Sequence, residues 1–212
     1  PHQQLTHEAY FYGLKFYVDE NVLAPRPDTE ILVEQVLENL PGDQELEILD
    51  MCTGSGCILL SILANRPKVH GIGADLSEKA LAVARKNGRD LGIKARWIYS
   101  DLFEKIQEQY DVIVSNPPYI RTDVIQGLME EVRLHEPYMA LDGHDDGLYF
   151  YRKIIAQAGD YLKPEGLLAF EIGYDQGEAV SSLMKTQGYT QVHVFKDLAG
   201  LDRVVTGRKN QE

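Results

Sequence analysis

Four adjacent residues near the middle of the chain, Asn116-Pro117-Pro118-Tyr119, have the chemistry to hold a planar amino group. The prolines stiffen the backbone, and Pro117 restricts Asn116 to an extended conformation. The Asn116 side chain offers an amide oxygen, and the proline carbonyls are free to accept hydrogen bonds. This pattern favours a reaction at a planar nitrogen and does not choose between glutamine, adenine, cytosine and guanine.

The nitrogen of such a group is a poor nucleophile because its lone pair is delocalised. Two acceptors, the Asn116 Oδ1 and the Pro117 carbonyl, can hold its two protons and turn the lone pair toward an electrophilic methyl group. Tyr119 can stack on the planar group. The predicted mechanism is therefore alignment and electrostatic stabilisation without a strong base, carried by Asn116, Pro117 and Tyr119. The alternative is a proline-rich turn that only closes a strand.

A second group of residues lies where a predicted strand, 46–51, turns into a predicted helix, 57–65. In a doubly wound sheet, ligands bind at the carboxyl ends of the strands. Gly54 and Gly56 permit positive φ and let a ligand approach the backbone closely. We predict that a cofactor is bound by Asp50, Cys52, Thr53, Gly54, Ser55, Gly56, Asp75, Leu76, Asp101, Leu102 and Asn116.

Acidic residues at successive strand ends indicate which cofactor this is. The loop lacks the third glycine of G-x-G-x-x-G, and Asp50 would repel a pyrophosphate but favour a cationic sulfonium or ammonium group. Asp75 can accept from ribose hydroxyls. Asp101 can accept from an adenine amino group whose face Leu102 and Phe103 cover. The combination fits S-adenosylmethionine better than a dinucleotide.

Short apolar runs alternate with helical patterns from residue 46 onward. The predicted strands cover 46–51, 69–74, 95–99, 111–115 and 167–172. The predicted helices cover 28–40, 57–65, 77–91, 147–162 and 176–187. This alternation predicts an α/β fold with a mostly parallel sheet and helices on both faces. The tail, 191–195 and 203–206, indicates an antiparallel pair at the edge, and 10–24 indicates a short hairpin.

The composition narrows the functional class. A chain of 212 residues can bury a sizeable core without disulfides. Its formal charge of −12 disfavours nucleic acid as a substrate. Two cysteines in one short segment are too few for a structural zinc site, and we expect free thiols, no metal and a cytoplasmic location. No run of about 20 apolar residues is present to span a membrane.

Beyond these residues, the sequence resembles the HemK/PrmC family, the protein-(glutamine-N5) methyltransferases that act on class-1 peptide-chain release factors. The resemblance runs from about Phe11 to Arg208. Besides the Asn-Pro-Pro-Tyr segment, it rests on Phe16-Tyr17-Val18, Pro25-Arg26-Pro27-Asp28-Thr29-Glu30, Glu136-Pro137, Ala140-Leu141-Asp142-Gly143 and Asp146-Gly147-Leu148.

The resemblance implies a class I methyltransferase fold, a Rossmann-like sheet of seven strands with the last strand antiparallel. It implies a catalytic domain at 25–212, preceded at 1–24 by a hairpin that remains from an N-terminal helical domain. The implied substrate is the glutamine of the release factor's Gly-Gly-Gln loop, and the implied product is S-adenosylhomocysteine. The residues implied to bind the substrate are Asn116, Pro117, Pro118, Tyr119, Arg26, Thr29 and Glu30. Cys52 departs from the glycine found in many methyltransferases.

Two other functional classes stay open at this point. One is an amino-methyltransferase acting on adenine, cytosine or guanine in DNA or RNA, or on a ribosomal-protein glutamine. The other is a non-catalytic module that keeps the cofactor fold. We expect a monomer, with His135 and His144 as loop histidines, and Glu171 either caps a turn or faces the cofactor.

Overall fold

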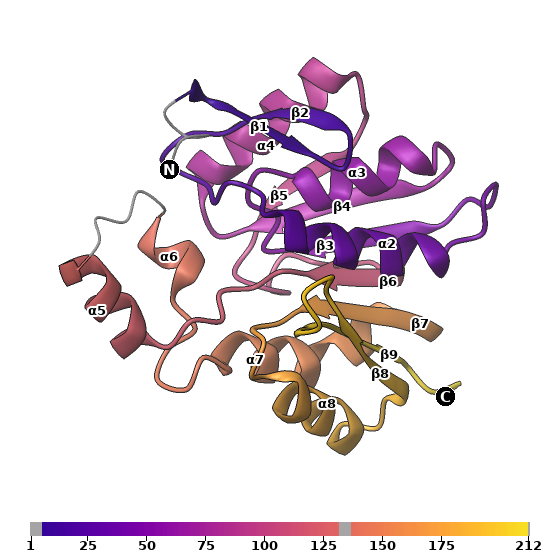
Figure 1. Cartoon of the computed structure of the whole chain (residues 1–212). Helices are drawn as coiled ribbons and strands as arrows, with labels where there is room; N and C mark the ends of the chain where they lie inside the picture. The colour runs from indigo at the N-terminus through magenta and orange to yellow at the C-terminus, as the bar shows by residue number, and fades with distance from the viewer. Residues whose placement is uncertain (1–5, 132–136, 212) are drawn as a thin grey trace.

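The computed structural model describes residues 6–131 and 137–211. Across these residues the fold is built on a seven-stranded sheet of order β5-β4-β3-β6-β7-β9-β8 (Figure 1). The strands are β3 (Glu47–Met51), β4 (His70–Asp75), β5 (Arg96–Tyr99), β6 (Tyr110–Ser115), β7 (Leu162–Glu171), β8 (Thr190–Lys196) and β9 (Asp202–Arg208). The strands from β3 to β7 pair in parallel, and β9 is antiparallel to both of its neighbours. The predicted fold class is thereby confirmed.

Helices cover both faces of the sheet. One face carries α2 (Glu30–Glu38), α3 (Cys57–Asn65) and α4 (Glu78–Leu91), and the other carries α7 (Tyr149–Ala158) and α8 (Gly177–Thr186) (Figure 1). In β7, Leu167 and Ala169 pack with the first group, while Leu168 and Phe170 pack with the second. Because successive side chains alternate between faces, a strand covered on both sides must be apolar throughout. No helix in the described part of the chain is long and apolar enough to cross a membrane.

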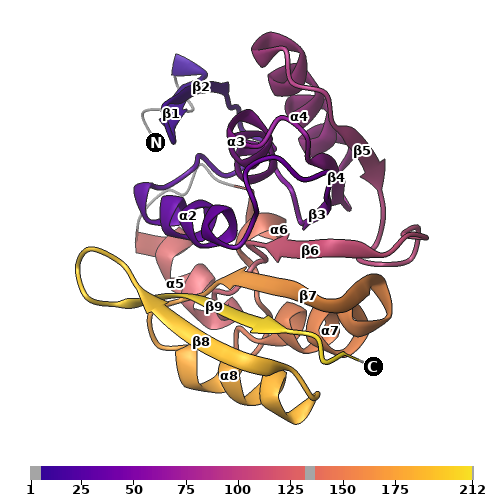
Figure 2. The same cartoon turned by 90° about the vertical axis from the view of Figure 1, so that its right-hand side faces the viewer.

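The two strands of the tail form the predicted antiparallel pair at the edge of the sheet. β9 lies inside the sheet, between β7 and β8, so that β8 forms the edge (Figure 2). Because β9 is antiparallel to both, β8 runs in the same direction as β7. The loop from β8 to β9 therefore lies at the carboxyl edge of the parallel strands.

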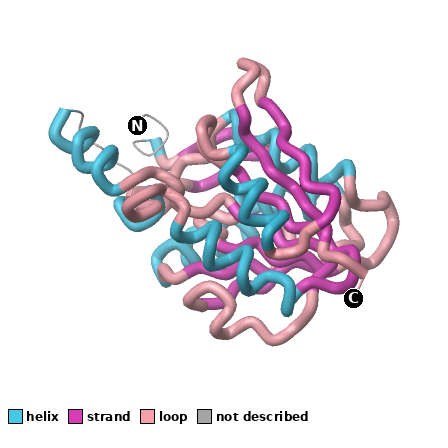
Figure 3. The backbone as a smooth tube through the Cα atoms, turned by 90° about the horizontal axis from the view of Figure 1, so that it is seen from below, coloured by secondary structure: helices cyan, strands magenta, loops and turns pink. Residues whose placement is uncertain are grey.

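Two regions depart from the predicted secondary structure. The predicted helix 147–162 ends earlier, in the short 3-10 helix η2 (Gly159–Tyr161), and Leu162 already pairs in β7. Pro164 is tolerated in that strand because the pairing with β6 shifts between Tyr110 and Val112, at a bulge. The helices α5 (Thr122–Glu131) and α6 (Tyr138–Leu141) were not predicted. α5 extends away from the sheet (Figure 3).

The N-terminal hairpin is shorter than predicted, with β1 (Glu8–Phe11) and β2 (Leu14–Tyr17). Asn87 of α4 holds it: the Asn87 Oδ1 accepts from the Tyr17 N–H at 2.7 Å, and its Nδ2 donates to the Tyr17 carbonyl at 3.0 Å. The same Nδ2 donates to the Ser55 carbonyl at 2.9 Å. One buried amide thus joins the hairpin to the glycine-rich turn.

The Trp97 ring packs directly against glycines of the sheet and of the turn. A Cβ on Gly73 would lie 2.6 Å from the Trp97 ring and 2.8 Å from the Thr53 Oγ1, and a Cβ on Gly56 would lie 2.8 Å from the ring. Gly56 also has φ +82°, which other residues rarely adopt. Trp97 is therefore a packing residue, and it requires glycine on the strand beside the turn.

Replacing Gly73 by Ala should lower the free energy of unfolding by about 1–3 kcal/mol, the usual cost of overpacking a close-packed site. Urea denaturation measures this change. The matched control is Gly42→Ala, where an added Cβ meets nothing within 4 Å. Equal stabilities of the two variants would contradict the close packing of Trp97 on β4.

Candidate active site

A cavity of about 260 Å³ opens at the carboxyl ends of the parallel strands. Its walls come from the turns after β3, β4, β5 and β6, from α6 and from the segment 21–26. The predicted site residues that line it are Arg26, Thr29, Cys52, Thr53, Gly54, Ser55, Asp75, Leu76, Asp101, Leu102, Asn116, Pro117, Pro118 and Tyr119. The predicted cofactor half and acceptor half therefore share one cavity. Within residues 6–131 and 137–211, no group of three or more His, Cys, Asp or Glu side chains is placed to hold a metal ion.

The turn after β3 is shaped by left-handed backbone conformations. Cys52, Gly54 and Gly56 have φ of 64°, 54° and 82°. The Thr53 N–H donates to the Ala74 carbonyl at 2.9 Å, which fastens the turn to the end of β4. Cys52 adopts a conformation that costs a residue with a Cβ more than it costs glycine. The turn nevertheless keeps its left-handed conformation with Cys52 at a position where many methyltransferases have glycine.

Asp75 presents its carboxylate at the end of β4. Its Oδ2 accepts from the Gly54 N–H at 2.9 Å, and its Oδ1 accepts from the Ser77 N–H at 3.0 Å. Burial raises the pKa of this carboxyl, and these backbone bonds lower it. Each oxygen keeps a second lone pair, so the group can still accept from hydroxyls in the cavity. Asp101 is exposed at the cavity wall beside the buried Leu102.

Three predicted residues are not among those that line the cavity, and their contacts with a ligand remain predictions. Asp50 is fully buried, and its Oδ2 accepts from the Thr53 hydroxyl at 2.8 Å. Gly56 faces Trp97. The Glu30 Oε2 accepts from the Tyr12 N–H at 2.9 Å, which ties α2 to the hairpin. These residues shape the walls of the cavity.

The buried environment of the Asp50 carboxylate disfavours its charged form. Its Oδ1 is buried without a hydrogen-bond partner among the described residues. Burial raises the pKa of this carboxyl to about 7, and the Thr53 hydroxyl opposes the shift. Through Thr53, Asp50 helps to fix the geometry of the turn, and its attraction to a cationic ligand remains a prediction.

The raised pKa of Asp50 predicts a pH dependence of stability. The folded state keeps a proton up to about pH 7, whereas the unfolded chain releases it near pH 4. This contribution to stability is complete below about pH 4 and is lost as the pH rises to about 7. The unfolding free energy of the wild type, relative to Asp50→Asn, should fall over this range and level off above it. Urea titrations at several pH values measure it, and a constant difference would contradict the assignment.

On the acceptor side, Asn116 and Pro117 follow the end of β6 and line the cavity. Asn116 is half-buried and Pro117 is buried. Among the described residues, no hydrogen bond reaches the Asn116 side chain or the Pro117 carbonyl. Both oxygens can therefore accept from a group bound in the cavity.

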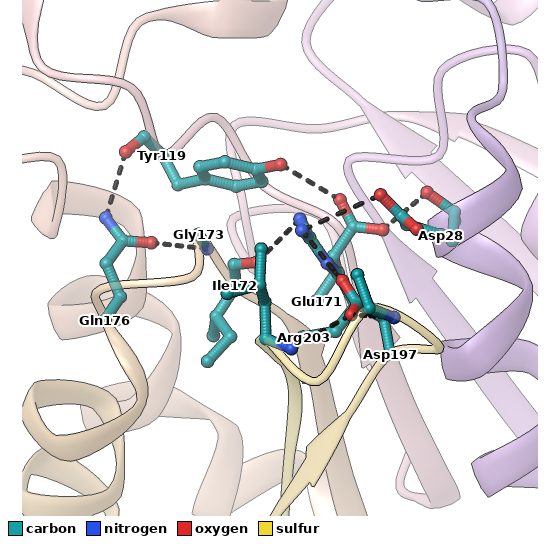
Figure 4. A network of polar contacts seen from close by, with 11 residues as sticks. Asp28, Tyr119, Glu171, Ile172, Gly173, Gln176, Asp197 and Arg203 are labelled. Carbon is teal, nitrogen blue, oxygen red and sulfur yellow. Dashed lines mark hydrogen bonds and ion pairs between the residues drawn. The ribbon is translucent and has the colours of Figure 1, made fainter.

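Tyr119 is fastened at several points (Figure 4). Its hydroxyl donates to the Glu171 Oε2 at 3.2 Å, and its carbonyl accepts from the Gln176 Nε2 at 3.0 Å. The loop at 143–147 packs on its backbone: an added Cβ would lie 2.8 Å from Tyr119 at Gly143 and 2.5 Å from its carbonyl at Gly147. Tyr119 thus anchors the acceptor loop, residues 116–119. Its stacking on a substrate remains a prediction.

Several residues that hold this loop in place were not predicted from the sequence as residues of the site. Glu171 had two open interpretations, and it lines the cavity while accepting from Tyr119 and from the Thr29 hydroxyl. Gln176 and Arg203 were not predicted at all. One signal was present for Glu171, because it is a charged residue inside the apolar run 167–172.

The two histidines have different outcomes. His144 is exposed in a loop, as predicted, with its ring 4.1 Å from that of Tyr149. His135 lies outside the described residues, as does Glu136.

Comparisons with known proteins define the class. Residues 26–133 match the family model described as "Methyltransferase small domain". A 16S rRNA methyltransferase of T. thermophilus, solved in complex with AdoMet and guanosine, has a TM-score of 0.67 at 17% identity, over 96% of this chain and 50% of that one. Its likeness shows the fold. Together with the cavity at the strand ends, these matches define a methyltransferase.

Closer relatives define the family. The release factor glutamine methyltransferase of Caulobacter vibrioides is 47% identical over 203 residues, which cover 94% of this chain and 70% of that protein. A solved release factor-specific protein-(glutamine-N5) methyltransferase from Alicyclobacillus acidocaldarius is 29% identical, with a TM-score of 0.54, over 92% of this chain and 99% of that one. The chain belongs to the release factor glutamine methyltransferase family, which confirms the resemblance seen in the sequence.

Proposed function

We propose that this enzyme transfers a methyl group from S-adenosylmethionine to the side-chain amide nitrogen of the glutamine in the Gly-Gly-Gln motif of class-1 release factors. The observation that carries this proposal is the pair of open acceptors on one loop, the Asn116 side chain and the Pro117 carbonyl, in the cavity that the glycine-rich turn also lines. The family's name supports the same acceptor. We further propose that the enzyme is cytoplasmic, since its substrate takes part in translation. We also propose that it acts as a monomer.

The cofactor half of the cavity fits S-adenosylmethionine. Asp75 has its carboxylate oriented by Gly54 and retains lone pairs for ribose hydroxyls. Asp101 and Leu102 offer an acceptor and an apolar surface for adenine. When bound, the cofactor supplies a methyl group on a positively charged sulfur, and it leaves as S-adenosylhomocysteine. The related fold solved with AdoMet supports this assignment.

The residues of the acceptor loop then act by alignment. The Asn116 Oδ1 and the Pro117 carbonyl each accept a hydrogen bond from one N–H of the glutamine amide, which draws the nitrogen out of conjugation and turns its lone pair toward the methyl group. The prolines and the anchored Tyr119 keep both acceptors in place, so no reorganisation is needed during transfer. An amide nitrogen that has gained a methyl group is a strong acid and releases its proton to water, so a base is not required.

A nucleic-acid amino group is the second candidate, because the same acceptor geometry suits adenine, cytosine or guanine. The related 16S rRNA methyltransferase acts on RNA. The net charge of −12 opposes binding to phosphates. Incubation with labelled cofactor, and with either release factor or RNA, separates the two candidates. Label in RNA and none in protein would overturn the proposal.

Replacing Asn116 by Ala should lower kcat for release-factor methylation by about 10²- to 10³-fold, as for the loss of one preorganised partner of the transition state. The dissociation constant for the cofactor should change much less than kcat, because Asn116 is only one of the predicted cofactor contacts and the turn after β3 is untouched. Mass spectrometry of the Gly-Gly-Gln peptide measures the added methyl group.

The matched control for this substitution is Asn65→Ala at the C-terminal end of α3, a residue that does not line the cavity and whose side chain donates to the Ser61 carbonyl at 2.8 Å. Wild-type rates in Asn116→Ala would show that the amide does not position the acceptor.

A further inference from the structure

We propose that Glu171 is a positioning residue that holds the acceptor loop, residues 116–119, against the N-terminal wall of the cavity. It acts through the Tyr119 and Thr29 hydroxyls. Arg203, from the antiparallel strand β9, balances its buried charge. The inference rests on the proposed function, in which the acceptor loop orients the glutamine amide.

Glu171 stands where three parts of the chain meet. It ends β7 and is only 3% exposed. Its Oε1 accepts from the Thr29 hydroxyl in η1 (Pro27–Thr29), and its Oε2 accepts from the Tyr119 hydroxyl at 3.2 Å. Figure 4 shows the Glu171 carboxylate facing the Tyr119 hydroxyl. Each oxygen of one side chain therefore fixes a different wall of the cavity.

Burying this carboxylate requires compensation. Burial raises the pKa of Glu171, and the Thr29 hydroxyl, Arg203 and the Tyr119 hydroxyl act in the opposite direction. The Arg203 side chain is only 13% exposed. A buried charge without compensation is strongly unfavourable, and the positive charge of Arg203 lowers that cost for the Glu171 carboxylate.

Arg203 is itself held in place by the β8–β9 loop. Its Nε and one terminal nitrogen donate to the Asp197 Oδ2 at 3.3 and 3.2 Å. The Asp197 Oδ1 accepts from the Ala199 and Leu201 N–H groups, each at 3.0 Å, which makes the loop rigid. The guanidinium also lies 3.7 Å from the Asp28 carboxylate, next to Thr29. The Arg203 guanidinium thus connects the C-terminal strands to the active site.

These contacts restrict the position of the acceptor loop. Among the described residues, no hydrogen bond reaches the Asn116 side chain or the Pro117 carbonyl, so the anchored Tyr119, three residues from Asn116, helps to fix where these groups lie. Positioning errors of about 1 Å can cost a reaction about 10²-fold. The loss of the Glu171 contact should therefore change the rate of transfer rather than the binding of the cofactor.

The test uses Glu171→Gln, Tyr119→Phe and the double variant in the full chain, with a release factor as substrate. The Gln side chain keeps the size and one acceptor but loses the charge and one hydroxyl partner. Each single variant should lower kcat by about 10- to 100-fold, with the cofactor dissociation constant within about twofold. The double variant should be no slower than the slower single variant, because both remove the same contact.

The control is Tyr151→Phe, which removes a 2.7 Å hydrogen bond to the Glu171 carbonyl and leaves both hydroxyl contacts of the Glu171 carboxylate in place. It should lower Tm and leave kcat unchanged. Multiplying losses in the double variant, or a wild-type kcat in Glu171→Gln, would overturn the positioning role. If Glu171→Gln fails to fold, Tyr119→Phe alone decides, and a wild-type kcat there overturns the proposal. A wild-type enzyme that does not methylate the release factor would instead refute the proposed function.

Discussion

The buried carboxylate of Glu171 is the interaction on which the arrangement of the active site depends. It joins the end of β7 to the turn before α2 through Thr29 and to the acceptor loop through Tyr119. A parallel sheet brings strand ends to one edge but does not fix the loops that follow them. Here the Glu171 carboxylate, whose charge Arg203 balances, holds those loops in place.

The cofactor half of the cavity is organised differently, by backbone shape. Glycines allow the turn after β3 to adopt left-handed conformations and allow Trp97 to pack against it. Asp75 receives N–H groups from Gly54 and Ser77, so its carboxylate is oriented before any ligand arrives. The enzyme thus combines a backbone-defined pocket with an acceptor loop that is held by side chains.

Much of the fold follows from local patterns in the sequence. The buried strands are apolar runs, and Ser77 caps α4 at the predicted position by accepting from the Ala80 N–H at 3.1 Å. The contacts that complete the site are not local: Thr29 and Glu171 are 142 positions apart. Single-sequence patterns cannot pair such residues, which is why Arg203 was not expected near the site.

A crystal structure of the enzyme with S-adenosylhomocysteine and a peptide containing Gly-Gly-Gln would test the account most directly. The predicted result places the glutamine side-chain nitrogen within about 2.7–3.2 Å of both the Asn116 Oδ1 and the Pro117 carbonyl. The Tyr119 hydroxyl should still donate to Glu171. A glutamine nitrogen that faces away from these two acceptors would contradict the account.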